Sequence, residues 1–335
     1  MTSTLDVVLL MRPRTERAFS IEAVFQTVAS HLPPDIRARV LVSPHPSRGL
    51  LPRLRGILHA ARAARGADVI HMTGDAHYLV LLLPRRRAVL TVHDCEFLDR
   101  TRGLKRFMLW LIWIWLPARR VAAITVVSEA SKAKLLHWLK VDPARIEVVE
   151  NPLTKVMCRV EKAFAEQPRL LMIGTAPHKN INRVAEAVGG LPVTLEVIGR
   201  LPEDRLARLR RHVDVVTRHD LTDAELAEAY AGADILMFPS LSEGFGLPII
   251  EAQAVGRPVI TSDRAPMSDV AGAAALKVDP EDTVAIRTAV ERLIDDADLR
   301  NRLIALGLEN VRRFTPERAA TAYAAVYRRV ALRAE

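Results

Sequence analysis

The 335-residue sequence predicts an α/β protein made of two successive doubly wound halves, each a parallel β-sheet with helices on both faces. Short runs of apolar or β-branched residues alternate with longer segments in which apolar residues recur every three or four positions. The short runs are continuously apolar, as expected of parallel strands that are buried on both faces. Strands that alternate with helices in this way are typical of doubly wound sheets.

The candidate strands fall into two groups separated by a gap. In the first half they are Asp6–Leu10, Arg39–Val42, Val69–His71, Ala88–His93, Ala123–Val127 and Ile146–Val149. In the second half they are Arg169–Ile173, Thr194–Ile198, Val213–Thr217, Ile235–Phe238, Pro258–Thr261 and Ala275–Val278. We therefore expect a first domain of residues 1–155 and a second of residues 165–315, because periodicity lapses between Glu150 and Pro168.

Capping residues mark several helix starts in the second half. Thr222 and Glu225 have the spacing of a capping box, and Asp279-Pro280 and Thr315-Pro316 each place a capping residue before a first-turn proline. The last helix, about Pro316–Arg333, follows the final α/β unit and is expected to cross back to the first domain. Residues 316–335 are therefore assigned to that domain.

Length and composition bound the class of protein. A chain of this length exceeds what one compact core usually serves, which predicts two domains. Half of the residues are apolar, which excludes a largely disordered chain. The two cysteines, Cys95 and Cys158, require no disulfide framework and fit a reducing cytosol. The N-terminal segment has an acidic residue before a short apolar run, which favours a first strand over a secretory signal.

The net charge of +9 is unevenly distributed. Residues 1–162 contain 26 Lys and Arg against 14 Asp and Glu, whereas residues 163–335 contain 22 against 25. The sequence has no zinc-finger spacing, RNA-recognition signature or long basic helix, so nucleic acid is not the expected partner. A basic face towards an anionic membrane or a phosphorylated substrate explains the one-sided charge better. A solvated arginine-rich surface is the alternative.

One apolar run, FMLWLIWIWLP (Phe107–Pro117), contains three of the four tryptophans and follows Lys105-Arg106. A membrane span needs roughly 20 apolar residues, and this run has 11, so it does not span a bilayer as a simple helix. Two interpretations stay open. It is either a buried helix between two strands or an interfacial helix, with tryptophans at headgroup depth and basic residues on lipid phosphates.

The segment PSLSEGFGLPIIEAQAVGRPVITSD (residues 239–263) contains the most informative chemistry. The two glycines of its loop let backbone N–H groups approach a ligand closely. The helix that follows points its positive end at the same place, which predicts an anion site. Glu243 lies in the loop and Glu251 lies about one turn inside the helix, so both glutamates flank this site.

This segment matches the glutamate–seven residues–glutamate element of the glycosyltransferase family 4 group of retaining GT-B enzymes, which the sequence closely resembles. Further matches span nearly the whole chain and are stronger in the second half: TVHD (91–94), ITVVSEASKAKLL (124–136), IEVVENPL (146–153), LLMIGTAPHKNINRVAEAV (170–188), LTDAELAEAYAGADILMFPS (221–240) and DVAGAAALKVDPED (269–282). The resemblance implies a GT-B fold, with two Rossmann-like domains that face each other across a cleft. It also implies a nucleotide sugar held mostly by the second domain.

The resemblance assigns roles to particular residues. It implies that Glu243 meets hydroxyls of the donor sugar and that Glu251 meets the ribose hydroxyls. Lys179 is expected to neutralise the donor diphosphate, because a fixed ammonium in a dry cleft stabilises the charge of the leaving group. The other expected donor-binding residues are Gly174, Thr175, Asn180, Gly244, Phe245, Gly246, Leu247, Arg200 and Leu221.

Residues of the first half are expected to complete the site. His93 in TVHD resembles the family's histidine near the donor sugar, and we group it with Glu243 and Lys179 as a candidate catalytic residue. Candidate acceptor-side residues follow the predicted strands, where doubly wound sheets bind ligands. They are Asp75, His77, Asp94, Arg12 and Arg14.

The sequence departs from the family pattern in three places. The loop after the first strand lacks the glycines common in the family. Thr175 stands where an arginine is frequent, and MSD (267–269) stands where Pro-Glu is common. No metal cluster stands out, because Asp296 and Asp298, the one Asp-x-Asp pair, are better placed to cap a helix than to bind a metal diphosphate. We expect neither a metal nor a cofactor.

The sequence therefore predicts a retaining, metal-independent hexosyltransferase. The expected reaction moves a mannose- or glucose-type sugar from a UDP- or GDP-sugar to a glycan or polyprenyl-linked acceptor, in cell-envelope or exopolysaccharide biosynthesis. The expected location is the cytoplasm, with peripheral contact at the inner face of the plasma membrane through Lys105-Arg106 and Phe107–Pro117. The alternatives are an inactive GT-B scaffold that binds sugar nucleotides, and a GT-B sugar-nucleotide epimerase.

Overall fold

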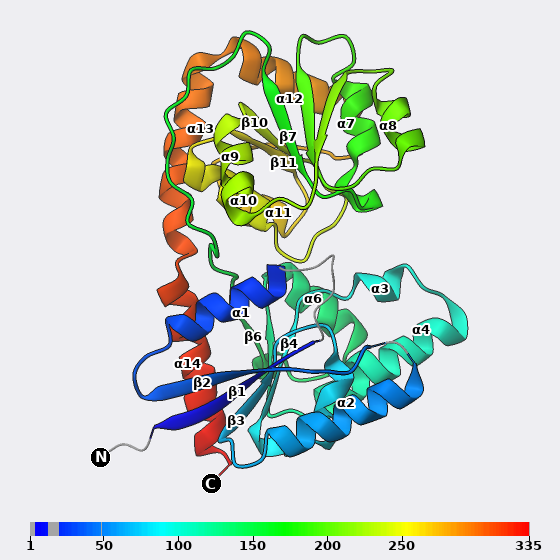
Figure 1. Ribbon diagram of the computed structural model, residues 1–335, viewed down its shortest axis with the longest axis vertical. Helices are drawn as coiled ribbons and strands as arrows, with labels where there is room; N and C mark the ends of the chain where they lie inside the picture. Colours follow the sequence, from blue (N-terminus) through cyan, green and yellow to red (C-terminus); the bar gives the residue numbers. More distant parts are fainter. Residues whose placement is uncertain (1–3, 13–19, 48, 335) are drawn as a thin grey trace. The chain divides into compact units, whose positions relative to one another are not determined.

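The computed structural model describes residues 4–12, 20–47 and 49–334. The chain divides into two compact units, Met1–Thr154 with Thr315–Glu335, and Lys155–Phe314. Each unit contains a six-stranded parallel sheet surrounded by helices (Figure 1). The predicted α/β class, with two parallel-sheet domains, is confirmed.

The sheet of the first unit has the strand order β2-β1-β3-β4-β5-β6, and all neighbouring strands are parallel. The strands are β1 (Leu5–Met11), β2 (Ile36–Val42), β3 (Val69–Met72), β4 (Ala88–Val92), β5 (Ala123–Val126) and β6 (Ile146–Val148). Every strand predicted for this half occurs, with small differences at the ends. The strand order reverses between β1 and β3, which makes the carboxyl ends of these strands the expected ligand position.

Helices pack on both faces of this sheet. They are α1 (Ser20–Ser30), α2 (Leu50–Ala63), η1 (His77–Leu82), η2 (Arg85–Arg87), α3 (Glu96–Asp99), α4 (Gly103–Leu109), η3 (Trp110–Trp115), α5 (Leu116–Arg119), α6 (Glu129–Trp138), η4 (Pro143–Arg145) and α14 (Pro316–Leu332). Successive strand residues point to opposite faces. One face, with Val8 and Leu10, joins the core cluster that contains residues of α2 and η1.

The C-terminal helix α14 covers the opposite face. Thr315 caps it by accepting the Arg318 N–H at 3.3 Å, and a proline occupies its first turn, as predicted. Tyr327 of α14 is fully buried, and its hydroxyl lies 2.8 Å from Nδ1 of His71 on β3. The other ring nitrogen of His71 lies 2.7 Å from the hydroxyl of Thr91 on β4. The predicted return of the last helix to the first domain is confirmed.

The tryptophan-rich run forms one continuous helical segment, α4–η3–α5, whose middle part η3 is a π-helix. Pro117 has no N–H, so the carbonyl oxygen of Trp113, four residues earlier, lacks the donor an α-helix would supply. His77 supplies a donor instead, because its Nδ1 lies 2.6 Å from this oxygen. Pro117 and the buried His77 thus explain why the Trp113 carbonyl oxygen bonds to a side chain at this point of the helix.

The tryptophans of this run are partly buried. Trp110 donates its indole N–H to the Trp138 carbonyl at 2.8 Å, and Trp113 donates to the Asp75 carbonyl at 2.9 Å. Both indole N–H groups are thus paired within the protein while Phe107 is half exposed, and the two interpretations of this run both stay predictions. In the part of the chain that the structure describes, no helix has the length and apolarity needed to cross a bilayer.

The sheet of the second unit has the strand order β12-β11-β10-β7-β8-β9, again with parallel neighbours. The strands are β7 (Arg169–Ile173), β8 (Thr194–Ile198), β9 (Asp214–Arg218), β10 (Ile235–Phe238), β11 (Val259–Ser262) and β12 (Leu276–Val278). This is the Rossmann order, and it reverses between β7 and β10. The strands predicted for the second half are all present.

Helices of the second unit connect these strands. They are η5 (Pro177–Lys179), α7 (Ile181–Ala187), α8 (Glu203–Leu209), α9 (Asp223–Gly232), α10 (Leu247–Val255), α11 (Met267–Ala271), α12 (Thr283–Asp295), α13 (Ala297–Asn310) and η6 (Val311–Arg313). The Thr222–Glu225 capping box is present, and Asp296 caps α13 as expected. The prediction that Asp279-Pro280 starts a helix is wrong. Those residues form a turn, and Asp282 caps α12 through the N–H groups of two following residues.

Candidate functional site

Two loops meet at the point in the second sheet where the strand order reverses. The loop after β7 contains residues 174–180, and the loop after β10 contains residues 239–246. A backbone hydrogen bond of 2.8 Å, from Leu241 N–H to the His178 carbonyl, joins them. Because ligands of doubly wound sheets bind at such reversal points, the two loops define the candidate site of this unit.

Lys179 and Glu243 form an ion pair between these loops. The Lys179 Nζ lies 2.6 Å from the Glu243 Oε1, and both side chains are largely shielded, at 15% and 14% exposure. Nζ also lies 4.6 Å from the centre of the Phe238 ring at the end of β10. The structure thus brings together the two residues that the sequence predicted as catalytic in this half.

Two backbone features shape the same loops. Gly174 has φ +88°, and an added Cβ would lie 3.1 Å from Lys179 Cε, so glycine leaves room for the lysine. Asn180 has φ +63° and is buried, with its amide nitrogen 3.1 Å from the Pro239 carbonyl and 2.5 Å from the Pro280 carbonyl. Asn180 therefore fastens the first loop to the second.

The helix α10 begins beside the ion pair. Gly246 precedes its first residue, Leu247, with φ +118°, a backbone region that favours glycine. The first N–H groups of a helix have no partners within the helix, so this end is suited to bind an anion. The predicted helix start and the glycine turn before it are both present. Phe245 is buried and packs edge-on against Phe314, so its side chain supports the loop.

Glu251 lies inside α10 and is only 6% exposed. Tyr230 of α9 donates its hydroxyl to Glu251 Oε2 at 2.6 Å. Burial raises the pKa of Glu251, while Lys155 and the Tyr230 hydrogen bond act to lower it. Burial together with Glu251 also raises the pKa of Tyr230 well above its ordinary value, so the phenol remains a proton donor. One carboxylate oxygen is thus fixed by the protein.

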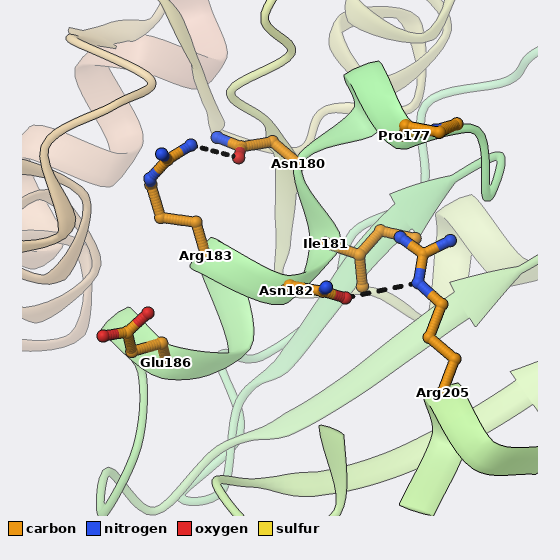
Figure 2. Close-up of a pocket in the computed structure, with 7 residues that line it drawn as sticks. All are labelled: Pro177, Asn180, Ile181, Asn182, Arg183, Glu186 and Arg205. Atoms are coloured by element: carbon orange, nitrogen blue, oxygen red, sulfur yellow. Dashed lines mark hydrogen bonds between the residues drawn. The ribbon is translucent and has the colours of Figure 1, made fainter. Parts of the chain in front are cut away.

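A pocket of about 430 Å³ lies beside the first turn of α7 (Figure 2). Its lining residues are Pro177, Asn180, Ile181, Asn182, Arg183, Glu186 and Arg205. Arg205 bonds to Asn182 at 3.2 Å and donates to the Thr175 carbonyl at 2.6 Å. Thr175 is thus held by an arginine through its backbone. The pocket does not include Lys179 or Glu243.

Two predicted donor-binding residues lie further along the sheet. Arg200, after β8, is exposed and pairs with Asp220, which also lies 2.9 Å from His219 Nδ1. The hydrogen bonds from Arg200 and His219 lower the pKa of Asp220. Leu221 follows this cluster and precedes the cap of α9. Gly244 lies in the loop between Glu243 and Phe245.

In the first unit, Arg12, Asp75 and His93 follow the neighbouring strands β1, β3 and β4. Arg12 donates to Asp75 at 2.7 Å and to Glu22 at 2.8 Å. His93 Nε2 lies 2.8 Å from the Thr73 carbonyl, which only accepts, so Nε2 carries the proton of the neutral ring. Burial lowers the pKa of His93 and favours this neutral form. These residues form a second polar cluster at a strand reversal.

Other acceptor-side candidates are placed differently. His77 is 2% exposed and bonded to Trp113, and burial lowers its pKa to about 4. This placement gives His77 a structural contact, and its role on the acceptor side stays a prediction. Asp94 is exposed and accepts the Glu96 N–H at 3.1 Å. Arg14 lies outside the described residues.

Sequence reasoning missed several residues that support the site. They are Tyr230, Phe238, Arg205, Glu22 and Lys155. A signal existed for Tyr230, because a tyrosine on the apolar face of a predicted helix needs a partner for its hydroxyl. Within the described part of the chain, no three His, Cys, Asp or Glu side chains gather as metal ligands would. The expectations about metals and cofactors stay predictions.

Solved structures show that the fold is GT-B. Sucrose-phosphate synthase (tll1590) from Thermosynechococcus elongatus aligns with 97% of this chain and 99% of its own, with a TM-score of 0.75 and 18% sequence identity. Two parallel-sheet units, each with polar clusters at its strand reversal, therefore place the chain among the GT-B proteins.

Family models identify the family. A glycosyltransferase family 4 model matches residues 5–154, and a glycosyl transferases group 1 model matches residues 167–296. The two matches together cover most of the chain, which belongs to glycosyltransferase family 4.

Several curated relatives are mannosyltransferases. The MMP α-(1→4)-mannosyltransferase of Mycolicibacterium hassiacum is 30% identical over 56% of this chain. The O-antigen chain mannosyltransferase B of Escherichia coli is 29% identical over 71% of it. These alignments span 48% and 70% of the relatives' own lengths, so the chain matches about half of the first relative.

Proposed function

We propose that this protein is a retaining hexosyltransferase that moves a mannose- or glucose-type sugar from a UDP- or GDP-sugar to a glycan or polyprenyl-linked acceptor. The observation that carries this proposal is the Lys179–Glu243 ion pair, which joins two loops at the strand reversal of the second unit. The mannosyltransferase relatives, including the O-antigen enzyme, support a hexose donor and an envelope polysaccharide product.

The charges of this site fit a sugar diphosphate. In the proposed complex, Lys179 turns from Glu243 to the diphosphate, and the first N–H groups of α10 bind its other oxygens. Glu243 is then released to accept hydrogen bonds from sugar hydroxyls. Lysine and helix end together stabilise the charge that develops as the diphosphate departs, and we propose that the reaction needs no metal or cofactor.

Glu251 fits the ribose. Tyr230 fixes Oε2 at 2.6 Å, so the carboxylate has a set orientation from which to accept a hydroxyl. A buried carboxylate that gains good hydrogen bonds recovers part of its desolvation cost. The ribose diol is a suitable donor of such bonds.

The transfer step needs no dedicated protein base. The bond between the anomeric carbon and the diphosphate oxygen breaks, and a bond to the acceptor oxygen forms on the same face. The acceptor proton passes to the departing phosphate oxygen. His93, neutral and fixed by Thr73, is proposed as a contact to the sugar or the acceptor. Arg12 and Asp75 are proposed on the acceptor side.

A thermal-shift panel tests the proposal. The full chain is melted with UDP, GDP, ADP, dTDP and their sugars, using wild type, Lys179→Ala and the control Lys277→Ala, which removes an exposed lysine on β12. At least one nucleotide should raise the melting temperature of wild type and control, and the shift should be much smaller in Lys179→Ala. The absence of a shift with every nucleotide would contradict the proposal.

The same panel separates the two glutamates. Glu251→Ala should weaken nucleotide binding, whereas Glu243→Ala should retain it and lose most sugar transfer. An equal loss of nucleotide affinity in both variants would overturn this division. A wild-type protein that binds the nucleotide sugar but releases no nucleotide with any acceptor would favour the inactive scaffold.

A further inference from the structure

The pocket beside α7 (Figure 2) lies within the second unit and apart from the Lys179–Glu243 ion pair. Its volume of about 430 Å³ is in the range of small-molecule pockets, roughly 300–1,000 Å³. Of its lining residues, only Asn180 belongs to the predicted donor site. The pocket is therefore a cavity whose occupant the proposed function does not explain.

Two arginines of this pocket have neutral hydrogen-bond partners. Arg183 donates through Nη1 to the side-chain oxygen of Asn180 at 2.7 Å. Arg205 donates through Nε to the side-chain oxygen of Asn182 at 3.2 Å and through Nη1 to the Thr175 carbonyl at 2.6 Å. In the part of the chain that the structure describes, neither arginine forms an ion pair with a carboxylate. Because each guanidinium has five N–H donors, both retain donors for an anion.

The surroundings of Arg205 favour an anion at this end of the pocket. Burial lowers the pKa of Arg205, and the positive charge of Arg208 lowers it further. A negative group at the guanidinium would oppose both effects, because an opposite charge stabilises the ionised form. A phosphate group has oxygen atoms spaced to accept two parallel hydrogen bonds from one guanidinium. Phosphate is therefore the group that fits this end of the pocket best.

The other end of the pocket contains a carboxylate. Glu186 follows Arg183 by three residues on α7, and Figure 2 shows both side chains on the side of the pocket away from the Arg205 guanidinium. The Glu186 side chain is exposed. A carboxylate repels a second anion but accepts hydrogen bonds from hydroxyl groups, and Arg183 can donate to hydroxyl oxygens. This end is therefore suited to the hydroxyl groups of an uncharged polyol.

We propose that the pocket binds the phosphate monoester of a small polyol, such as a sugar or glycerol. Its phosphate lies at Arg205, and its hydroxyl groups lie between Arg183 and Glu186. The guanidinium nitrogen atoms that hold Thr175 and Asn180 keep their present bonds, because the other N–H groups of both arginines bind the ester. This binding does not depend on the proposed function.

The two arginines also connect the pocket to the loop that carries Lys179. Arg205 holds the backbone of this loop at Thr175, and Arg183 holds the side chain of Asn180, which bonds to the loop after β10. An ester that fixes both guanidinium groups should therefore restrict the motion of the Lys179 loop. We expect it to strengthen nucleotide binding, and a nucleotide to strengthen ester binding by the same factor. This coupling rests on the proposed function.

Titration calorimetry of the full chain tests the binding. The probes are glycerol 3-phosphate, mannose 6-phosphate, ribose 5-phosphate, inorganic phosphate and mannose. At least one ester should bind roughly tenfold more tightly than inorganic phosphate or mannose, because only the ester fills both ends of the pocket. Arg183→Gln and Arg205→Gln should each weaken ester binding by roughly tenfold or more. Glu186→Ala should weaken binding of the ester but not of inorganic phosphate, which has no polyol hydroxyl groups.

Two control variants separate the pocket from other sites. Arg292→Gln removes an exposed arginine on α12 and should leave ester binding unchanged. Lys179→Ala should also retain it. Loss of ester binding in Lys179→Ala without loss in Arg183→Gln would place the ester at the donor site and overturn the proposal. Failure of every ester to bind would overturn it too, as would an affinity for inorganic phosphate or mannose that equals that for the esters.

Nucleotide titrations on the same samples report the coupling. A saturating ester should raise the nucleotide affinity of wild type severalfold and leave that of Arg183→Gln unchanged. A nucleotide affinity that is the same with and without ester would overturn the coupling. A chain that binds an ester in the pocket but binds no nucleotide would contradict the proposed function and leave the pocket assignment intact.

Discussion

The Tyr230 hydroxyl donates a hydrogen bond to the buried carboxyl group of Glu251, the proposed ribose contact, and opposes the effect of burial on its pKa. Burial opposes the charged carboxylate, and the phenol at 2.6 Å partly offsets this opposition. Lys155 acts in the same direction. In the proposed complex the ionised carboxylate is the stronger acceptor of a ribose hydroxyl, so we expect the pKa of Glu251 to set the acid limit of nucleotide binding.

The substitution Tyr230→Phe should shift the acid limit of nucleotide binding to higher pH. Removing the phenol removes a cause that lowers the pKa of Glu251, so the pKa rises further. Binding that needs the carboxylate is complete above this pKa and falls as the pH drops below it. Titration calorimetry at a series of pH values should therefore show a ratio of wild-type to variant affinity that grows as the pH falls. A ratio that stays constant with pH would assign Tyr230 a packing role only.

Among the secondary-structure elements, the strands could be predicted from the sequence, whereas the π-helix and one helix start could not. Continuous apolar runs such as Ile235–Phe238 mark buried parallel strands without reference to the rest of the chain. The π-helix is followed by Pro117, but its partner His77 is distant in sequence and reaches the Trp113 carbonyl only through tertiary structure. The start of α12 was misplaced because Asp279 and Asp282 both carry capping side chains, and local pattern does not rank them.

The candidate site likewise contains some features that the sequence predicts and others that it does not. Lys179, Glu243 and the α10 start were predictable because each sits in a recognisable strand–loop–helix string. The pairing of Tyr230 with Glu251 joins separate helices and leaves no spacing to recognise. The structural contact of His77 was not predictable, because its position after a strand looks the same in the sequence as that of Asp75. Its burial is a property of the fold.

His77→Asn tests the support of the π-helix. Asparagine places an amide donor near the position of Nδ1 but does not titrate. The pKa of His77 is about 4 in the fold, below the ordinary 6.5, so its stabilising contribution is complete above pH 6.5 and is lost as the pH falls towards 4. The loss amounts to roughly 3 kcal/mol. Urea unfolding between these pH values should show a flatter pH dependence in the variant. Equal slopes would contradict the assignment.

At the scale of the whole molecule, the chain closes the first unit with its last helix. The His71–Tyr327 contact ties residues far apart in sequence within one core. Burial lowers the pKa of His71 to about 3, so the ring is neutral at physiological pH. Its two nitrogens need the hydroxyls of Tyr327 and Thr91 as partners.

Tyr327→Phe should destabilise the first unit. The substitution keeps the ring but leaves a buried nitrogen of His71 unpaired, at a cost of about 1–3 kcal/mol. Hydrogen exchange of β3 and β4 amides should accelerate, while exchange in β7 and β10 stays unchanged. Tyr78→Phe, which removes another hydroxyl of the first unit from its 3.1 Å contact with Ser47, serves as a control. Faster hydrogen exchange in both units alike would show that the stabilising effect of α14 is not confined to the first unit.

The packing of α14 on the first unit also affects the order in which the two units can fold during synthesis. Residues 155–314 form one uninterrupted unit, whereas the first unit needs both its opening 154 residues and the helix after residue 315. Domains generally fold as units during synthesis. The half that emerges first therefore lacks Tyr327, the α14 partner of His71, until the other half has been translated, and we expect a chaperone to bind the incomplete sheet face during that time.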